Sequence, residues 1–259
     1  MKLDTLGNDK LIILIDEFAQ AIQNIKGNGT DGIHNAIHLL QSNRVLRQNT
    51  EINHKFQFVY TGSISLEGIA RRLNCSSFIN DLDIVRVSAL NPLEGRQMTH
   101  KLLESVDFTM IDTVIEYMLK GIKYLNPLYI QLCIDKIRDI SIEENLVEIT
   151  EDIVNNAVLR IIQEENNKFE SWHERLNIYS GNEYRFIIEL LNIISLSQSR
   201  QITSNEIYNI ATKYDLEDTH TSLINTLIDD GYINNIDNNK IYMFNSPILS
   251  MWWCKRIAN

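Results

Sequence analysis

Two short apolar runs in the first quarter of the chain predict two buried β-strands. Residues 11–15 read Leu-Ile-Ile-Leu-Ile, and residues 56–60 read Phe-Gln-Phe-Val-Tyr. Runs of this length without strict alternation are typical of strands that helices cover on both faces, as in a parallel sheet. The segment from Phe18 to Asn53 is helical in pattern, with an interruption at residues 26–32. Strand, helix and strand together predict a right-handed crossover unit, and residues 83–87 predict a third, short strand.

Beyond residue 90 the pattern changes to helices with good start signals. Asn91-Pro92 followed by Glu94 supplies an N-cap, a first-turn proline and a capping-box acid. Asn126-Pro127 repeats this device ahead of a second apolar helix. Thr150, followed by two acids, opens a further helix, because early acids suit the positive end of the helix dipole. We expect a compact all-α domain over residues 91–168.

The last third of the chain has the order of elements of a winged helix. Aliphatic side chains at helical spacing predict three helices between residues 184 and 228, and a hairpin with its turn at 237–239 follows. A segment at 247–253 also has a helical pattern. We expect this winged-helix domain over residues 169–259, with the likeliest linker to the preceding helices at residues 164–170.

The composition is that of an ordinary globular chain, with 44% hydrophobic and 22% charged residues among 259. Lysine and arginine number 24 against 34 acids, for a net charge of −10. Such a chain repels polyphosphate, so binding of nucleic acid would need a local basic patch. The three cysteines form no CxxC pair, which indicates a reducing compartment and favours the cytoplasm. The run at residues 11–15 is too short for a signal peptide or a membrane span.

Two acids follow the first predicted strand directly. Asp16 and Glu17 come after five aliphatic residues. At the carboxyl end of a parallel strand, an acid faces the crevice where ligands bind. Asp16 could hold Mg²⁺ through oxygen ligation, and Glu17 could orient the water that attacks a γ-phosphate. The alternative is a buried strand that merely ends at a solvated acidic turn.

Small polar residues follow the second predicted strand in the same way. Thr61, Gly62 and Ser63 come directly after residues 56–60. A hydroxyl at this place can donate a hydrogen bond to a phosphate oxygen or to the attacking water. The alternative is an ordinary strand-to-helix turn in which Ser63 is the N-cap.

The ordered set of segments resembles the AAA+-related STAND ATPases, particularly the group described as predominantly archaeal ATPases. In that family a Walker B strand is followed by a sensor-1 strand ending in Gly-Ser, a helix start reading Asn-Pro-Leu, a lid helix reading Asn-Pro-x-Tyr-Ile-Gln, and a winged helix. The corresponding segments of this chain are Leu11–Glu17, Phe56–Ser63, Asn91–Leu93, Asn126–Gln131 and Tyr184–Trp253.

The resemblance implies a mostly helical chain in three parts. These are a partial P-loop NTPase (AAA+-like) α/β core at residues 1–90, an all-α lid at residues 91–168 and a winged-helix domain at residues 169–259. The complete ATPase would use ATP and Mg²⁺, bound between core and lid. Hydrolysis would reset the arrangement of the lid and the winged helix.

The resemblance also assigns roles to four residues. Asp16 resembles the acid of the magnesium site, and Glu17 resembles the catalytic glutamate. Thr61 or Ser63 resembles the sensor position that contacts the nucleotide.

The chain departs from the family at the phosphate-binding loop. The motif G-x-x-x-x-G-K-[ST] lies upstream of the acidic strand in such proteins, whereas only ten residues precede Leu11. The glycines at residues 26–32 come after that strand and are not followed by Lys-Ser or Lys-Thr. This chain alone is therefore expected to be inactive. In the family's strand order, residues 56–60 would then form an open edge. We expect an upstream segment or another polypeptide to pair with this edge.

Two other classes of function stay open. One is a non-catalytic interaction or regulatory protein that keeps the ATPase scaffold. The other is a winged-helix DNA-binding regulator, but its third helix, within residues 215–230, carries five acids and no Lys or Arg, and phosphate contacts need the opposite charge. His34 and His38 lie four apart and could share a metal, although a surface pair without a nearby acid is the simpler interpretation.

Overall fold

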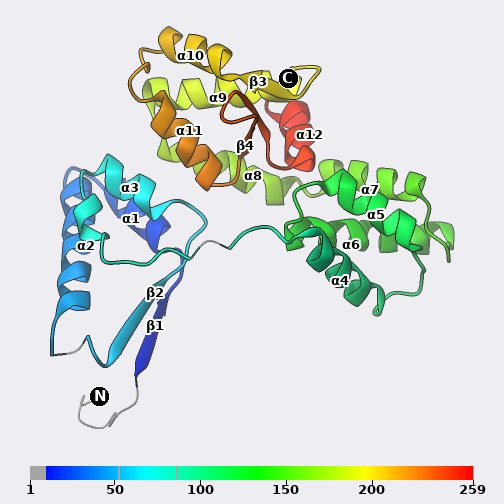
Figure 1. The fold of residues 1–259 in the computed structure, drawn as a ribbon, viewed down its shortest axis with the longest axis horizontal. Helices are drawn as coiled ribbons and strands as arrows, with labels where there is room; N and C mark the ends of the chain where they lie inside the picture. Colours follow the sequence, from blue (N-terminus) through cyan, green and yellow to red (C-terminus); the bar gives the residue numbers. More distant parts are fainter. Residues whose placement is uncertain (1–9, 52, 86, 259) are drawn as a thin grey trace. The chain divides into compact units, whose positions relative to one another are not determined.

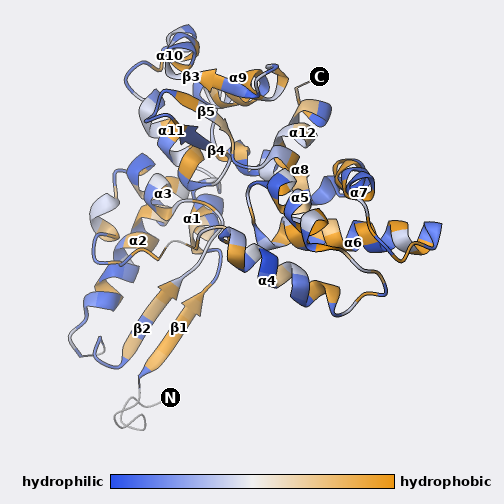
Figure 2. Ribbon diagram, turned by 45° about the vertical axis from the view of Figure 1, so that its right-hand side comes forward, coloured by the Kyte–Doolittle hydropathy of each residue, from blue (hydrophilic) through white to orange (hydrophobic). Residues whose placement is uncertain are grey.

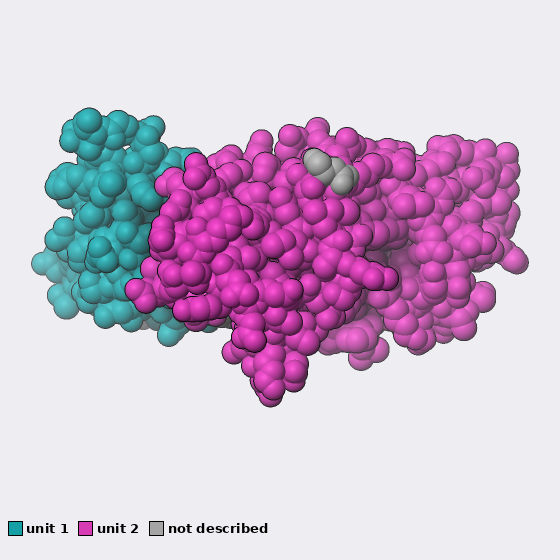
Figure 3. Space-filling view, turned by 90° about the horizontal axis from the view of Figure 1, so that it is seen from above, with its two compact units in different colours: residues 1–85 teal, residues 86–259 magenta. Residues whose placement is uncertain are grey.

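The computed structural model describes residues 10–51, 53–85 and 87–258, and the chain divides after Val85 into two compact units. Figure 1 traces the elements and Figure 3 colours the units separately. Both units consist mainly of helices; the first has a small parallel sheet and the second a small antiparallel one. The prediction of a mostly helical α/β chain is therefore confirmed, while the three predicted domain ranges stay predictions.

The first unit contains the predicted strand, helix and strand. Its elements are β1 (Leu11–Ile15), α1 (Phe18–Lys26), α2 (Gly32–Gln48), β2 (Phe56–Tyr60), α3 (Leu66–Arg72) and a short 3₁₀ turn, Ser76–Phe78. The two strands are parallel, and their register pairs Leu11 with Phe56 and Ile15 with Tyr60. The helical interruption expected at residues 26–32 is the turn between α1 and α2.

The core of the first unit lies where α1, α2 and α3 meet. Phe18 and Ile22 of α1, Leu40 of α2 and Ile69 of α3 are all buried. The turn between α1 and α2 is tight at Gly32, where a Cβ atom would lie 2.4 Å from the carbonyl oxygen of Lys26. Only glycine fits this approach, which positions both helices against the core.

The third strand predicted at residues 83–87 is wrong for the positions that the structure describes. Residues 83–85 and 87 have neither strand nor helix, and residue 86 lies outside the described residues. Ile84, Val85 and Val87 are 61%, 86% and 93% exposed. A strand forms only beside a neighbour that takes up its backbone hydrogen bonds, and the described residues of this unit offer this segment none.

The second unit begins with four helices, and the sequence predicts the starts of three of them, α4, α6 and α7, correctly. They are α4 (Pro92–Leu103), α5 (Asp112–Ile122), α6 (Pro127–Glu144) and α7 (Glu151–Glu164). The capping box of Asn91 and Glu94 is complete, with both hydrogen bonds formed. Asn126 caps α6 by accepting from the Leu128 amide, whereas Thr150 stands at the N-cap of α7 without a side-chain hydrogen bond.

The rest of the second unit has three helices, a hairpin and a closing helix, as predicted, with two additions. Its elements are α8 (Asn166–Arg175), a 3₁₀ turn (Leu176–Ile178), α9 (Gly181–Leu196), β3 (Gln201–Thr203), α10 (Ser204–Lys213), α11 (His220–Asp229), β4 (Ile233–Ile236), β5 (Ile241–Phe244) and α12 (Pro247–Arg256). The sheet order is β3-β5-β4, with both pairs antiparallel. The sequence did not predict β3 or α8.

The linker predicted at residues 164–170 is wrong, because this stretch is helical apart from Glu165. Phe169 of α8 is 1% exposed and belongs to the same buried cluster as the side chains of α5, α6, α9 and α12. The second unit thus has one continuous core. Among the described residues, no helix combines the length and the apolar character that crossing a bilayer requires.

Candidate functional site

The carboxyl ends of β1 and β2 lie side by side, because the two strands are parallel and end in register. The amide of Thr61 donates to the carbonyl oxygen of Ile15 over 3.0 Å, and the amide of Phe18 donates to the carbonyl oxygen of Thr61 over 3.1 Å. These backbone bonds continue the ladder one step past each strand. They fix the two polar tips, Asp16-Glu17 and Thr61 to Ser63, against each other.

The first contact between the tips joins Asp16 and Thr61. The hydroxyl of Thr61 donates a hydrogen bond to Oδ1 of Asp16. The same carboxylate oxygen accepts the backbone amide of Glu17 over 2.9 Å. Both side chains are exposed, so the remaining lone pairs of the carboxylate are open to a ligand.

The second contact joins Glu17 and Ser63. Oε2 of Glu17 accepts from the Ser63 hydroxyl over 3.1 Å and from the Ser63 amide over 3.3 Å. Glu17 also has φ 49° and ψ 35°, a left-handed conformation immediately before α1. A non-glycine residue in this region costs about 1–3 kcal/mol, and such residues gather at functional sites. The backbone and the two hydrogen bonds together fix the direction of this carboxylate.

The oxygen donors of the site suit a hard cation that also binds water or phosphate oxygens. Asp16 and Thr61 offer oxygen, which is what Mg²⁺ takes, and Mg²⁺ is usually held by one or two carboxylates together with waters and substrate phosphates. Within the described ranges, no three side chains of His, Cys, Asp or Glu gather closely enough to hold a metal ion by themselves. The residues present therefore fit the metal end of a metal–nucleotide complex and do not form a dedicated metal cage.

Over the part of the chain that the structure describes, the sheet that carries the site has only two strands, so both of its edges are open, and one of its faces is exposed. Among the described residues β2 has a single strand neighbour, β1. Ile12 and Leu14 of β1 are 58% and 72% exposed, although Figure 2 shows both strands in the hydrophobic colour. The sequence predicts strands covered on both faces, and the described chain covers one.

Comparisons with known proteins identify a shared fold. The chain is similar to a solved Walker-type ATPase, paby2304 of Pyrococcus abyssi, with a TM-score of 0.57 and 14% identity over 94% of this chain and 63% of that chain. The chain shares its fold with an ATPase. It spans less than two thirds of the length of that protein.

A second solved structure is less similar. It is the ORC2 protein of Aeropyrum pernix in ADPNP–ADP complexes, with a TM-score of 0.37 and 14% identity over 99% of this chain and 68% of that chain. No protein-family model matches the chain, and no curated protein matches it. The fold shared with the Walker-type ATPase is the extent of the similarity that these comparisons show.

The other residues that the sequence singled out do not gather into a site. His34 and His38 are exposed on α2, with ring centroids 6.5 Å apart, and Nδ1 of His38 contacts the Ser42 hydroxyl at 3.4 Å.

Sequence reasoning missed one concave region, a shallow hollow of about 360 Å³ along α9. Its lining is mainly apolar and includes Ile188, Ile193 and Leu196. The carboxylate of Glu189 at this hollow is already bonded to Lys213 and Tyr214. No sequence pattern distinguishes these residues from an ordinary half-buried helix face.

Proposed function

We propose that the chain is the C-terminal portion of an ATP-binding and ATP-hydrolysing switch ATPase of the STAND-type AAA+ class. The observation that carries the proposal is the pair of acid–hydroxyl contacts, Asp16 with Thr61 and Glu17 with Ser63, at the ends of adjacent parallel strands. The fold shared with a Walker-type ATPase supports it. The proposed parts are an incomplete nucleotide core at residues 1–90, a helical lid at 91–168 and a winged helix at 169–259.

The proposal gives each site residue a task. Asp16 would hold Mg²⁺ through its carboxylate, and the single hydroxyl proton of Thr61 either orients that carboxylate, as in this structure, or turns to donate to a phosphate oxygen. Glu17 accepts a hydrogen bond from the attacking water and so directs it at the γ-phosphate. Ser63 fixes the Glu17 carboxylate. When bound, Mg²⁺ would neutralise part of the negative charge that develops on the phosphates.

The proposal also requires a second segment for the phosphates. The chain has no G-x-x-x-x-G-K-[ST] loop, and the backbone amides and lysine of such a loop form the main cradle of a triphosphate. We propose that the segment bearing this loop pairs with the open edge of β2 and covers Ile12 and Leu14. A strand in this place would take up the free backbone groups of β2, and the helix that follows such a loop would cover the exposed aliphatic face.

The metal half of the site is testable on the chain as it stands. Mn²⁺, a paramagnetic substitute for Mg²⁺, should broaden the NMR amide signals of Asp16 and Thr61 first. The change Asp16→Asn should weaken Mn²⁺ binding on the order of tenfold or more, because it removes the charged ligand. The control is Asp31→Asn, an exposed acid of the same unit whose side chain caps nothing. Equal Mn²⁺ affinity in both variants would remove Asp16 from the metal site.

The catalytic half needs the chain joined to any sequence that its gene encodes upstream of Met1. With a phosphate loop present, Glu17→Gln should retain bound ATP while turnover falls by about 10²–10⁴-fold, the range for a positioned general base. Glu51→Gln, at an exposed acid in the same unit, is the matched control. Unchanged turnover in the Glu17 variant would exclude the catalytic role.

The second candidate function is a non-catalytic interaction module that keeps the scaffold. The exposed aliphatic side chains of Ile12 and Leu14 favour it, because contiguous exposed apolar surface marks interaction sites. A gene that supplies no loop, together with Mn²⁺ binding that is insensitive to Asp16→Asn, would decide for it. Binding of a DNA duplex is the weakest alternative. Residues 215–230 carry five acids and no Lys or Arg, and contacts with DNA phosphates need positive charge.

A further inference from the structure

We propose that residues 87–258 form one rigid body, in which the helical bundle (α4 to α7) and the C-terminal half (α8 to α12) have no hinge between them. Four sets of contacts carry this inference: a line of buried rings, an ion cluster at the junction of α7 and α8, hydrogen bonds from α12 to that junction, and contacts of the hairpin with the α5–α6 turn. The rigidity itself is independent of the proposed function. Its consequence for a nucleotide switch rests on that function.

The buried rings connect the bundle to the last helix through α8. Phe169 of α8 lies between Tyr129 of α6 and Trp252 of α12, with ring centroids 6.2 Å and 5.8 Å away. All three side chains are at most 2% exposed. Each aromatic side chain of this kind buries about 150–250 Å². A rotation of α12 relative to α6 would expose these rings to water.

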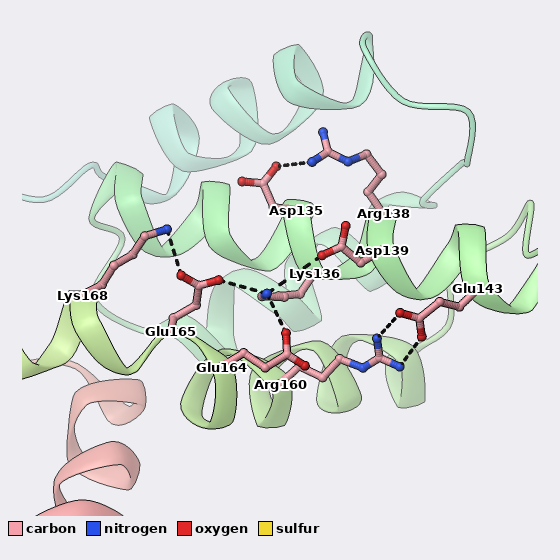
Figure 4. Close-up of polar contacts among 9 residues, drawn as sticks. All are labelled: Asp135, Lys136, Arg138, Asp139, Glu143, Arg160, Glu164, Glu165 and Lys168. Atoms are coloured by element: carbon pink, nitrogen blue, oxygen red, sulfur yellow. Dashed lines mark hydrogen bonds and ion pairs between the residues drawn. The ribbon is translucent and has the colours of Figure 1, made fainter.

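The ion cluster lies at the break between α7 and α8, which is where a hinge between the two halves would be expected. Glu165 is the one non-helical residue between α7 and α8. Its carboxylate binds Nζ of Lys136 from α6 at 2.9 Å and Nζ of Lys168 from α8 at 3.1 Å. Lys136 is 8% exposed and also binds Glu164 at 2.7 Å. Figure 4 shows Lys136 pointing at both glutamates, so the charges of the cluster tie the junction to α6.

The last helix binds the same junction. Nε1 of Trp252 donates to Oδ1 of Asn166 over 3.1 Å, and Nη2 of Arg256 donates to the carbonyl oxygen of Gln163 over 3.2 Å. Asn166 and Gln163 stand on the two sides of Glu165 in the chain. The junction is therefore held by α6 and by α12 together, and a bend at Glu165 would break both sets of bonds.

The hairpin adds contacts far along the chain from this junction. Gly231, just before β4, is so close to α8 that a Cβ atom there would lie 3.6 Å from the ring of Trp172 and 3.9 Å from the hydroxyl of Tyr124. The hydroxyl of Tyr232 donates to the carbonyl oxygen of Trp172 over 2.6 Å. Nζ of Lys123 contacts the sulfur of Met243 in β5 at 3.4 Å. The α5–α6 turn and the hairpin are thus joined directly.

These contacts change the expected working of the switch. The sequence resemblance implies that hydrolysis resets the lid against the winged helix. Such a change needs a second arrangement of the packed core, and reaching it would require the ring, ion, α12 and hairpin contacts to break together. In the proposed ATPase, a nucleotide-driven change would therefore carry residues 87–258 as a whole.

The first test measures a distance within the 259-residue chain. Spin labels go on cysteines that replace Lys120 of α5 and Asn209 of α10, both exposed, in a Cys254→Ser background that leaves the buried Cys75 and Cys133 in place. We expect one narrow distance distribution in pulsed electron spin resonance without nucleotide. A broad or two-peaked distribution would overturn the proposal, whether or not the chain binds ATP.

The second test asks whether both halves lose protection together. Phe169→Leu removes the middle ring and should speed amide hydrogen exchange in α6 and in α12 by the same factor, on the order of tenfold or more. The control, Tyr208→Leu, changes a ring that is 50% exposed and should leave both helices unchanged. Faster exchange in only one of the two helices would show two separate domains. Neither test depends on nucleotide, so a failure of the proposed function would not be mistaken for a failure of this inference.

Discussion

Lys136 shows how one buried cation depends on its partners. Burial alone would lower the pKa of Lys136, but hydrogen bonds to Glu164 and Glu165 outweigh it, so the pKa lies above the ordinary 10.5. The hydrogen bond from Lys136 is also the main reason why the pKa of Glu165 lies below the ordinary 4.5. A buried charge that loses its partners costs far more than an exposed one. The stability of this cluster therefore depends on pH at both ends of the scale.

The sign of that dependence follows from the two directions. The contribution of Glu165, whose folded-state pKa is lowered, is complete above pH 4.5 and is lost as the pH falls through the folded value. The contribution of Lys136 is complete below pH 10.5 and is lost as the pH rises through its folded value. We predict that Lys136→Met lowers the free energy of unfolding by about 1–2 kcal/mol at pH 7, and by less at pH 3.5. Urea unfolding of both proteins at the two pH values measures this.

A matched control separates the cluster from charge in general. Lys101 contacts Glu104 at 2.5 Å, but their side chains are 77% and 64% exposed. Lys101→Met should change the free energy of unfolding by no more than about 0.5 kcal/mol at either pH. An effect of Lys136→Met that is equal at pH 7 and pH 3.5 would contradict the role assigned to Glu165.

At the scale of elements, two helical glycines that look alike in the sequence have different surroundings. Gly121 of α5 has nothing within 4 Å of the place where a Cβ atom would stand. At Gly95 of α4 the same atom would lie 2.9 Å from Cδ1 of Leu125, which is buried. Alanine is a better helix former than glycine by up to about 1 kcal/mol. Only at Gly121 can an alanine gain this helix preference without a steric clash.

We therefore predict opposite outcomes for two alanine substitutions. Gly121→Ala should raise the free energy of unfolding by about 0.5 kcal/mol, since the site lies near the end of its helix. Gly95→Ala should lower it by about 1 kcal/mol or more, because Leu125 must leave its packed position. Chemical denaturation of the two variants beside the parent chain measures the difference. Equal stabilisation by both would show that Leu125 moves aside without cost.

The same scale shows why some elements and contacts were predictable from the sequence. The meeting of Asp16 with Thr61 follows from topology alone, because parallel strands that end in register bring their next residues together. The left-handed backbone of Glu17 has no local signal. Residues 83–87 have strand composition, but a strand also needs a neighbour. The polar stretch around Glu165 has the composition of a linker. Its contacts with Lys136 and with α12 cannot be seen in the local sequence, because these partners lie far away along the chain.

At the scale of the whole molecule, the chain has two separate hydrophobic cores, and the core of the second unit is much larger than that of the first. The first unit has a small core around Ile22 and Leu40, and its sheet leaves Ile12 and Leu14 exposed. The second unit buries a single large cluster that runs through all of its helices except α4, which packs side chains against it. Because burial of apolar surface dominates folding stability, we expect the first unit to unfold at a lower denaturant concentration than the second.

The three tryptophans allow the two units to be followed separately. Trp172, Trp252 and Trp253 all belong to the second unit, so their fluorescence reports that unit alone, while far-ultraviolet circular dichroism reports both. We predict that in urea the dichroism changes in two steps and that fluorescence follows only the later one. Two transitions seen by different probes are the signature of units that unfold independently.

A reciprocal pair of core substitutions makes this prediction specific. Leu40→Ala, at a side chain of the first unit that is 1% exposed, should destabilise the early step by about 2–5 kcal/mol and leave the fluorescence midpoint unchanged. Ile137→Ala, at a side chain of α6 that is 0% exposed, should move the fluorescence midpoint and leave the early step in place. If either substitution shifted both steps, the units would be coupled in solution. The open sheet would then be stabilised by the second unit, and the need for a separate segment at the edge of β2 would weaken accordingly.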